Sequence, residues 1–132
     1  MRAGRALLLA TLLGATACGG GSDLSAPLAG PLDLTIRTPS DDDGIVLVEV
    51  TGGTVDSVTA LGYRTEASSV GTAPLRIVVS GALRDGKLVR IWVPDRTRGS
   101  DYSATVVEAA ARTTYQLQDV ADYRIDVTGT AP

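Results

Sequence analysis

The chain contains no histidine and no phenylalanine, and it has a single cysteine, Cys18. Without histidine, neither a Ser-His-Asp nor a Cys-His catalytic site can be built. Zinc and copper sites depend on clusters of His and Cys ligands, so they are not expected either. One cysteine cannot form a disulfide within the chain, and the fold must be held by packing. The core is therefore expected to consist of Val, Leu, Ile and Ala, with Trp92 and a few tyrosines.

The first 17 residues have the three parts of a secretory signal peptide. Arg2 and Arg5 form a basic start, residues 6–13 are almost wholly apolar, and small residues precede Cys18. The apolar stretch is well short of the ~20 residues that a helix needs to cross a bilayer. An unpaired cysteine in an exported chain then has two interpretations. It is a free thiol after an ordinary cleavage site, or it is a site of lipid attachment.

The small residues ending in Ala17-Cys18 resemble the lipobox of bacterial lipoproteins, with Ala15 where that family favours leucine. The resemblance implies that the signal peptide, residues 1–17, is cut off and that the Cys18 sulfur carries a diacylglyceryl group. Two or three acyl chains, such as palmitate, hold a protein stably on a membrane. Residue 19 is Gly rather than the Asp that resembles an inner-membrane retention signal, so the outer membrane is the favoured destination.

Positive charge is scarce along the whole chain, with 12 Lys and Arg against 15 Asp and Glu. Once Arg2 and Arg5 leave with the signal peptide, the net charge falls from −3 to near −5. An acidic surface repels phosphate backbones, so nucleic acid is not expected as a partner. The same charge argues against a basic patch that holds anionic lipid, which leaves membrane attachment to the acyl chains.

Residues 18–31 are rich in Gly, Ser, Ala and Pro, which is typical of a flexible linker. Its expected reach is roughly 20 Å. From residue 32 to residue 129, apolar and polar residues alternate in short segments separated by turn residues, as in strands with one buried face. We therefore predict an all-β domain, a single antiparallel β-sandwich of about 7–9 strands. The expected strands are 32–38, 45–51, 54–61, 74–80, 87–93, 101–109, 113–118 and 122–128.

Trp92 is the first candidate for a binding residue. In the strand 87–93, Val89, Ile91 and Val93 share one face, and Leu88, Arg90 and Trp92 share the other. If the first face is inward, Trp92 is exposed and suits a contact with a protein or a glycan. If the faces are inverted, Trp92 belongs to the core. The binding residues expected on the first interpretation are Trp92, Arg90, Arg96 and Arg98.

The acidic cluster Asp41-Asp42-Asp43 is the one candidate for a metal site. Adjacent carboxylates repel one another, and a bound Ca²⁺ with oxygen ligands would remove that repulsion. Asp95 or Asp101 would have to complete such a site. The spacing is not that of a calcium-binding loop, however, and Asp and Gly are also what a turn between strands prefers. A solvated turn is therefore the favoured interpretation, and no metal or cofactor is expected.

Glu49 and Glu108 are acidic residues within predicted strands, and such a pair is what catalysis by carboxylates alone would require. A buried Glu49 would have a raised pKa, which is a property of many active sites. The favoured alternative is that Glu49 reaches solvent or pairs with an arginine. Nothing in the spacing selects these two residues as a pair, so we do not expect an enzyme.

The segments 44–63 and 85–93 resemble cohesin-type and other immunoglobulin-like bacterial sandwiches, in which a Gly-x-Leu-x-x-Ile strand crosses the core. Gly86, Leu88 and Ile91 match that pattern. The resemblance implies a module that recognises proteins. We therefore expect a lipid-anchored envelope lipoprotein whose non-catalytic β-sandwich binds a protein or a glycan. The alternative is a structural or assembly accessory of the outer membrane without a specific ligand.

Overall fold

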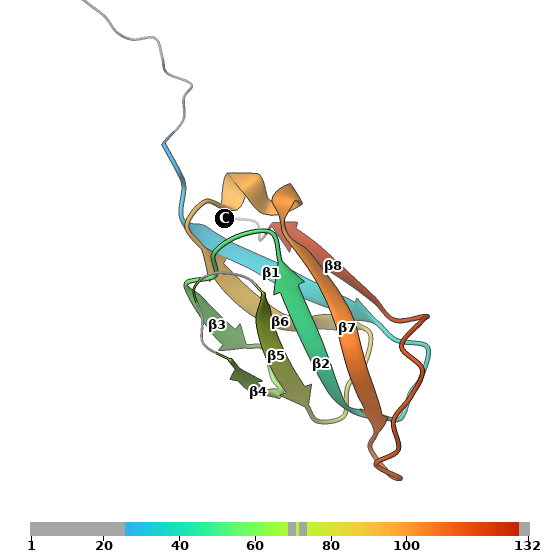
Figure 1. Ribbon diagram of the computed structural model, residues 1–132. Helices are drawn as coiled ribbons and strands as arrows, with labels where there is room; N and C mark the ends of the chain where they lie inside the picture. Colours follow the sequence, from blue (N-terminus) through green and yellow to red (C-terminus); the bar gives the residue numbers. More distant parts are fainter. Residues whose placement is uncertain (1–25, 69–70, 72–73, 130–132) are drawn as a thin grey trace, which may run out of the picture.

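Two four-stranded antiparallel sheets pack face to face in the computed structural model of the chain (Figure 1). The structure describes residues 26–68, 71 and 74–129. Sheet A has the order β3-β6-β1-β8, and sheet B has the order β4-β5-β2-β7. The strands of sheet A are β3 (Ser57–Ala60), β6 (Gly86–Val93), β1 (Gly30–Arg37) and β8 (Arg124–Gly129). Those of sheet B are β4 (Arg64–Ala67), β5 (Leu75–Ser80), β2 (Asp43–Thr51) and β7 (Ser103–Ala111). The predicted all-β sandwich is confirmed.

Two segments differ from the predicted strands. Residues 113–118 do not form a strand, because the chain turns directly after β7: the Tyr115 backbone N–H donates to the Ala111 carbonyl at 3.0 Å, and Tyr115 has a φ of 60°. Only an isolated bridge joins Leu117 to Ala110. Conversely, the sequence does not predict β4, since its four residues are mostly polar and exposed and carry no alternation. The predicted loop after β6 contains a short 3-10 helix, η2 (Arg96–Asp101).

The core lies between the sheets and is built from the alternating residues that the sequence indicates. On β1, Leu32, Leu34 and Ile36 are buried as predicted. In sheet B, every second residue of the two central strands is buried, because one face of each strand points at sheet A. These inward residues are Val46, Val48 and Val50 on β2 and Leu75, Ile77 and Val79 on β5.

Leu88 corrects the predicted faces of β6. The alternation places it outward with Arg90 and Trp92, but it is fully buried. The cause is a β-bulge: Leu34 of β1 lies opposite Val89 and Thr35 lies opposite Lys87, so Leu88 is an extra residue between them. Leu88 and Val89 therefore both contribute to the core, while the alternation beyond them is as predicted.

A tight turn after β2 brings two backbone segments into contact. Gly52 has a φ of 111°, and a Cβ atom at this position would lie 2.0 Å from the Asp101 carbonyl oxygen. The Tyr102 hydroxyl group closes the turn by donating a hydrogen bond of 2.6 Å to the Thr54 carbonyl oxygen. Burial raises the pKa of Tyr102 above its usual value. Only glycine fits at position 52, where the chain leaving β2 crosses the residues that join η2 to β7.

The N-terminal segment joins the sandwich at the end that carries η2. The Arg96 backbone N–H donates to the Leu28 carbonyl at 2.8 Å, and the Leu28 N–H donates to Asp95 Oδ1 at 3.3 Å. Strand β1 begins at Gly30, two residues before the predicted boundary of the domain. The predicted signal peptide (residues 1–17), Cys18 and the first part of the predicted linker lie outside the described residues.

Candidate binding site

Trp92 is exposed on the outer face of sheet A, as the first interpretation of β6 predicted. Its side chain is 41% exposed, and it lies between Pro31 of β1 and Ser57 of β3. Val89, Ile91 and Val93 are fully buried on the opposite face. The tryptophan is therefore not part of the core, and the outer face of sheet A offers one aromatic ring.

Arg90, the predicted neighbour of Trp92, is held in an ion pair. Its Nε atom lies 2.6 Å from Asp33 Oδ1, and its Nη2 atom lies 3.1 Å from Asp33 Oδ2. Lys87 Nζ lies 2.9 Å from the same carboxylate, which is only 1% exposed. The hydrogen bonds from Arg90 lower the pKa of Asp33 to about 2 against the opposing effect of burial. Arg90 is therefore held against the sheet by this ion pair, with its side chain partly exposed.

The other two arginines of the predicted binding set also make contacts within the domain. Arg98 Nε lies 2.9 Å from Asp101 Oδ2 at the end of η2. Arg96 packs over β1, since a Cβ atom at Gly30 would lie 2.6 Å from Arg96 Cδ. Asp95 caps η2 by accepting a hydrogen bond of 3.1 Å from the Thr97 backbone N–H. It also accepts one of 2.6 Å from the Thr97 hydroxyl group, and this bond lowers the pKa of Asp95. Trp92 thus has no group of free arginines around it.

The three aspartates of the acidic cluster have different surroundings. Asp43 is buried and accepts hydrogen bonds from the Tyr123 and Thr38 hydroxyl groups. Burial, together with the bond to Asp43, raises the pKa of Tyr123 to about 12. Asp42 accepts a hydrogen bond of 2.6 Å from the Thr113 hydroxyl group, and Asp41 is exposed.

These separate partners bear on the predicted alternative of a calcium site. The described residues contain no group of three or more His, Cys, Asp or Glu side chains placed to hold one metal ion. The aspartate turn instead ties the end of β1, the start of β2 and the segment between β7 and β8 together through Asp43 and Asp42.

Glu49 pairs with an arginine, as favoured from the sequence. Its Oε2 atom lies 3.2 Å from Arg76 Nη2 on the adjacent strand β5, on the outer face of sheet B. Glu108 lies on the same face but opposite Leu47 of β2. The two carboxylates therefore occupy different surroundings: one is held in an ion pair, and the other borders an apolar surface.

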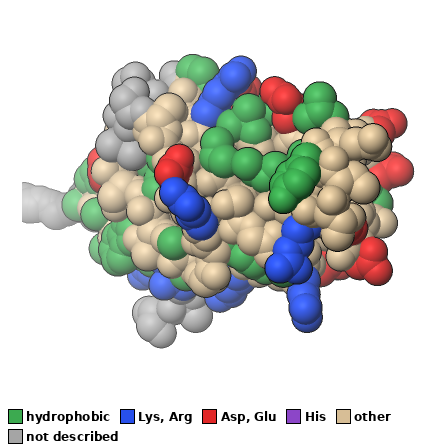
Figure 2. Space-filling model, turned by 90° about the horizontal axis from the view of Figure 1, so that it is seen from below, with side chains coloured by type: hydrophobic (Ala, Val, Ile, Leu, Met, Phe, Trp, Pro, Cys, Tyr) green, Lys and Arg blue, Asp and Glu red, His purple; other side chains and the backbone are tan. Residues whose placement is uncertain are grey.

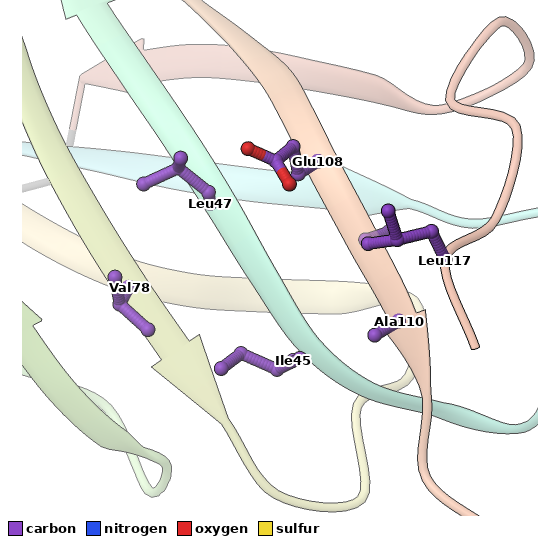
Figure 3. A pocket seen from close by; sticks show the side chains of 7 residues that line it. Ile45, Leu47, Val78, Glu108, Ala110 and Leu117 are labelled. Atoms are coloured by element: carbon purple, nitrogen blue, oxygen red, sulfur yellow. The ribbon is translucent and has the colours of Figure 1, made fainter. Parts of the chain in front are cut away.

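That apolar surface is a shallow groove on the outer face of sheet B (Figure 3). Side chains of β5, β2 and β7 form its floor, and Leu117 approaches from the segment after β7. The hollow has a volume of about 140 Å³. We call this surface the sheet B groove. It is lined by Ile45, Leu47, Val78, Glu108, Ala109, Ala110 and Leu117.

Two further hollows continue the sheet B groove, and both include Ile45. One is bordered by Arg64, Glu66 and Val78, and the other by Arg112 and Tyr115. Seen from below, the molecule shows hydrophobic side chains gathered together, with acidic and basic side chains beside them (Figure 2). The groove therefore has an apolar centre and a charged rim, which is the composition of a protein-binding surface.

Most of the large apolar side chains that are exposed in the described part of the chain lie at this groove. Of the described residues, five large hydrophobic side chains are exposed, and three of them line the groove or its continuation. Ile45 is 40% exposed, Leu117 is 73% exposed and Tyr115 is 84% exposed. Tyr115 also has a positive φ, which is uncommon outside glycine. Exposed apolar clusters of this kind mark sites of interaction.

The sequence pattern did not identify this site, although one signal was present. The segment 45–51 is apolar on both faces apart from Glu49, a pattern that is also typical of a central strand. In a two-layer sandwich, however, the outer face of even a central strand meets solvent. Ile45 and Leu47 are the residues on that outer face. In such a fold, a strand with apolar residues on both faces is therefore a signal for a binding surface.

Comparison of the chain with protein-family models, with curated proteins and with solved structures finds no match. No helix in the described part of the chain has the length and hydropathy that crossing a membrane requires. The arrangement of side chains in the sandwich is thus the basis for the functional argument.

Proposed function

We propose that this protein is a lipid-anchored envelope lipoprotein whose β-sandwich is a non-catalytic module that binds another envelope protein. The proposed anchor is Cys18, and the outer membrane is the favoured location. Support for the anchor comes from the basic start, the apolar stretch and the small residues before the single cysteine. The binding role is supported by the sheet B groove, with its three exposed apolar side chains.

A protein suits the groove better than a glycan does. The floor is made of aliphatic side chains, and Glu108 is the one charged side chain among the groove residues. Glycans need several hydrogen-bonding groups around a stacking ring, whereas protein interfaces have apolar centres and charged rims. The groove therefore supports a binding module more than an accessory without a specific ligand.

The position of the groove suits an anchored module. The chain joins the sandwich beside η2, where Thr51 of β2 pairs with Ser103 of β7. Ile45 lies toward the opposite end of β2, about 20 Å away at the rise of an extended strand. In Figure 1 the N-terminal segment and η2 are at the top, and the ends of β5 and β7 that carry the groove are at the bottom. An anchor at the N-terminus would thus present the groove away from the membrane.

Ile45→Asp is expected to abolish capture of the partner. The change places a charge at the centre of the groove, where a bound apolar side chain could not compensate for its dehydration. Thr59→Asp is the matched control, because Thr59 is an exposed strand residue on the outer face of sheet A. After reversible crosslinking in cells and purification from the membrane fraction, the wild type and Thr59→Asp should retain the same partner band. Equal partner bands in all three proteins would contradict the binding role of the groove.

A further inference from the structure

The charges at the rim of the sheet B groove differ in whether they are paired. At the rim, Arg64 Nη2 lies 3.8 Å from Glu66 Oε1. Farther along the outer face of sheet B, Glu49 is paired with Arg76. Glu108 and Arg112 have no ion pair and no side-chain hydrogen bond within the part of the chain that the structure describes. These two residues border the hollows on either side of Ile45.

Glu108 and Arg112 belong to one line of side chains along β7. Ala109 and Ala111 are buried, so Glu108 and Ala110 point outward from β7. Arg112 is the first residue of the turn after the strand, and it borders the hollow that contains Ile45 and Tyr115. Four residues of extended chain place Glu108 and Arg112 about 13 Å apart. The groove therefore offers a negative group, an apolar centre and a positive group in succession along β7 and the start of the turn that follows it.

We propose that the sheet B groove takes an extended peptide segment of the partner protein, in which a basic, an apolar and an acidic side chain occupy alternate positions. This inference rests on the proposed function. In an extended peptide, alternate side chains point to one face about 7 Å apart, so the outer two of three are about 13 Å apart. The basic side chain meets Glu108, the apolar side chain enters the hollow beside Ile45, and the acidic side chain meets Arg112.

The span between the charges argues against smaller ligands. The charged groups of a free amino acid or of a phospholipid headgroup are too close together to reach Glu108 and Arg112 at once. A second copy of this chain could pair its Arg112 with Glu108, and its Glu108 with Arg112, only if β7 of the two copies ran antiparallel. The two N-terminal segments would then leave at opposite ends, which conflicts with two anchors in one membrane. Mutual repulsion between two acidic chains also opposes this pairing.

Charge reversal tests the proposed pairing. The probe is a capped nine-residue threonine peptide that carries Arg, Leu and Glu at alternate positions, titrated into the mature chain with Cys18→Ser and followed by backbone amide NMR. Binding near the millimolar range is expected for so short a peptide. The amides of the groove strands should shift, and those around Trp92 should not. E108R and R112E should each weaken binding about fivefold.

The double variant E108R/R112E should return the affinity to within about twofold of the wild type. It exchanges the positions of the two charges, and a peptide that contacts only side chains of the groove can bind with its chain direction reversed. Failure of the double variant to restore binding would overturn the inference, and so would shifts centred on Trp92. Concentration-dependent shifts without peptide would also overturn it, because the occupant would then be a second copy. If partner capture depends on Ile45 while the charge variants have no effect, this inference fails and the proposed function stands.

Discussion

Asp33→Asn is expected to lower the free energy of unfolding by about 2 kcal/mol at pH 7. The carboxylate is buried beneath Arg90 and Lys87, and its loss leaves both cations without their anionic partner. The cost stays below that of a fully buried pair, since the Lys87 side chain is largely exposed and Arg90 is partly exposed. Urea denaturation of both proteins measures the difference. Asp126→Asn, an exposed aspartate on the outer face of β8, is the matched control and should change stability by less than about 0.5 kcal/mol.

The same ion pair gives the protein a specific acid sensitivity. The pKa of Asp33 is about 2 in the folded state, and an unperturbed aspartate has a pKa near 3.9. Because the folded pKa is lowered, the stabilisation is complete above about pH 4 and is lost as the pH falls toward about 2. The wild type should therefore lose about 2 kcal/mol more than Asp33→Asn between these pH values. Parallel acid profiles for the two proteins would contradict this account of the pair.

Gly52→Ala is expected to cost more than about 3 kcal/mol, and it is the most damaging small substitution that we predict. The added methyl group would lie 2.0 Å from the Asp101 carbonyl oxygen and 2.8 Å from Tyr102 Cα, and both are backbone atoms. Relief would require β2 and the start of β7 to move apart.

Gly62→Ala separates the steric effect of Gly52→Ala from the backbone effect. Gly62 also has a positive φ, 101°, but no atom lies within 4 Å of its hypothetical Cβ. Its replacement should cost only about 1 kcal/mol, the conformational cost of placing alanine at positive φ. If urea denaturation gave equal losses of unfolding free energy for the two variants, the close backbone contact at Gly52 would be contradicted.

The fold could be predicted because its strands carry a simple signal. β1 alternates Leu32, Leu34 and Ile36 with polar residues, and each of the three is buried. Period-two burial follows from strand geometry alone and does not depend on which strand is the neighbour. The errors lie where other interactions decide. Leu88 is placed by a bulge in its pairing with β1, and β4 depends on pairing with β5 rather than on its own composition.

The candidate site was harder to predict, because it depends on which strands become neighbours. Val78, Ile45 and Ala110 come from three strands that are distant in the sequence, and only the order β5-β2-β7 brings them together. The sequence left two alternatives for Trp92, and the exposed position is the one observed. The burial of Asp33 and its ion pair with Arg90 were not foreseen. To predict which charged side chains meet across a sheet, one must know the register in which the strands pair, and the sequence pattern does not contain it.

The anchor is the feature on which the orientation of the groove depends, and intact-mass spectrometry of the membrane fraction tests it most directly. The wild type is predicted to give a mass that begins at Cys18 and includes acyl chains. Cys18→Ser should lose the acyl mass and leave the membrane fraction. A wild-type chain with an unmodified thiol in the soluble fraction would contradict the account, because the groove would then belong to a freely diffusing domain.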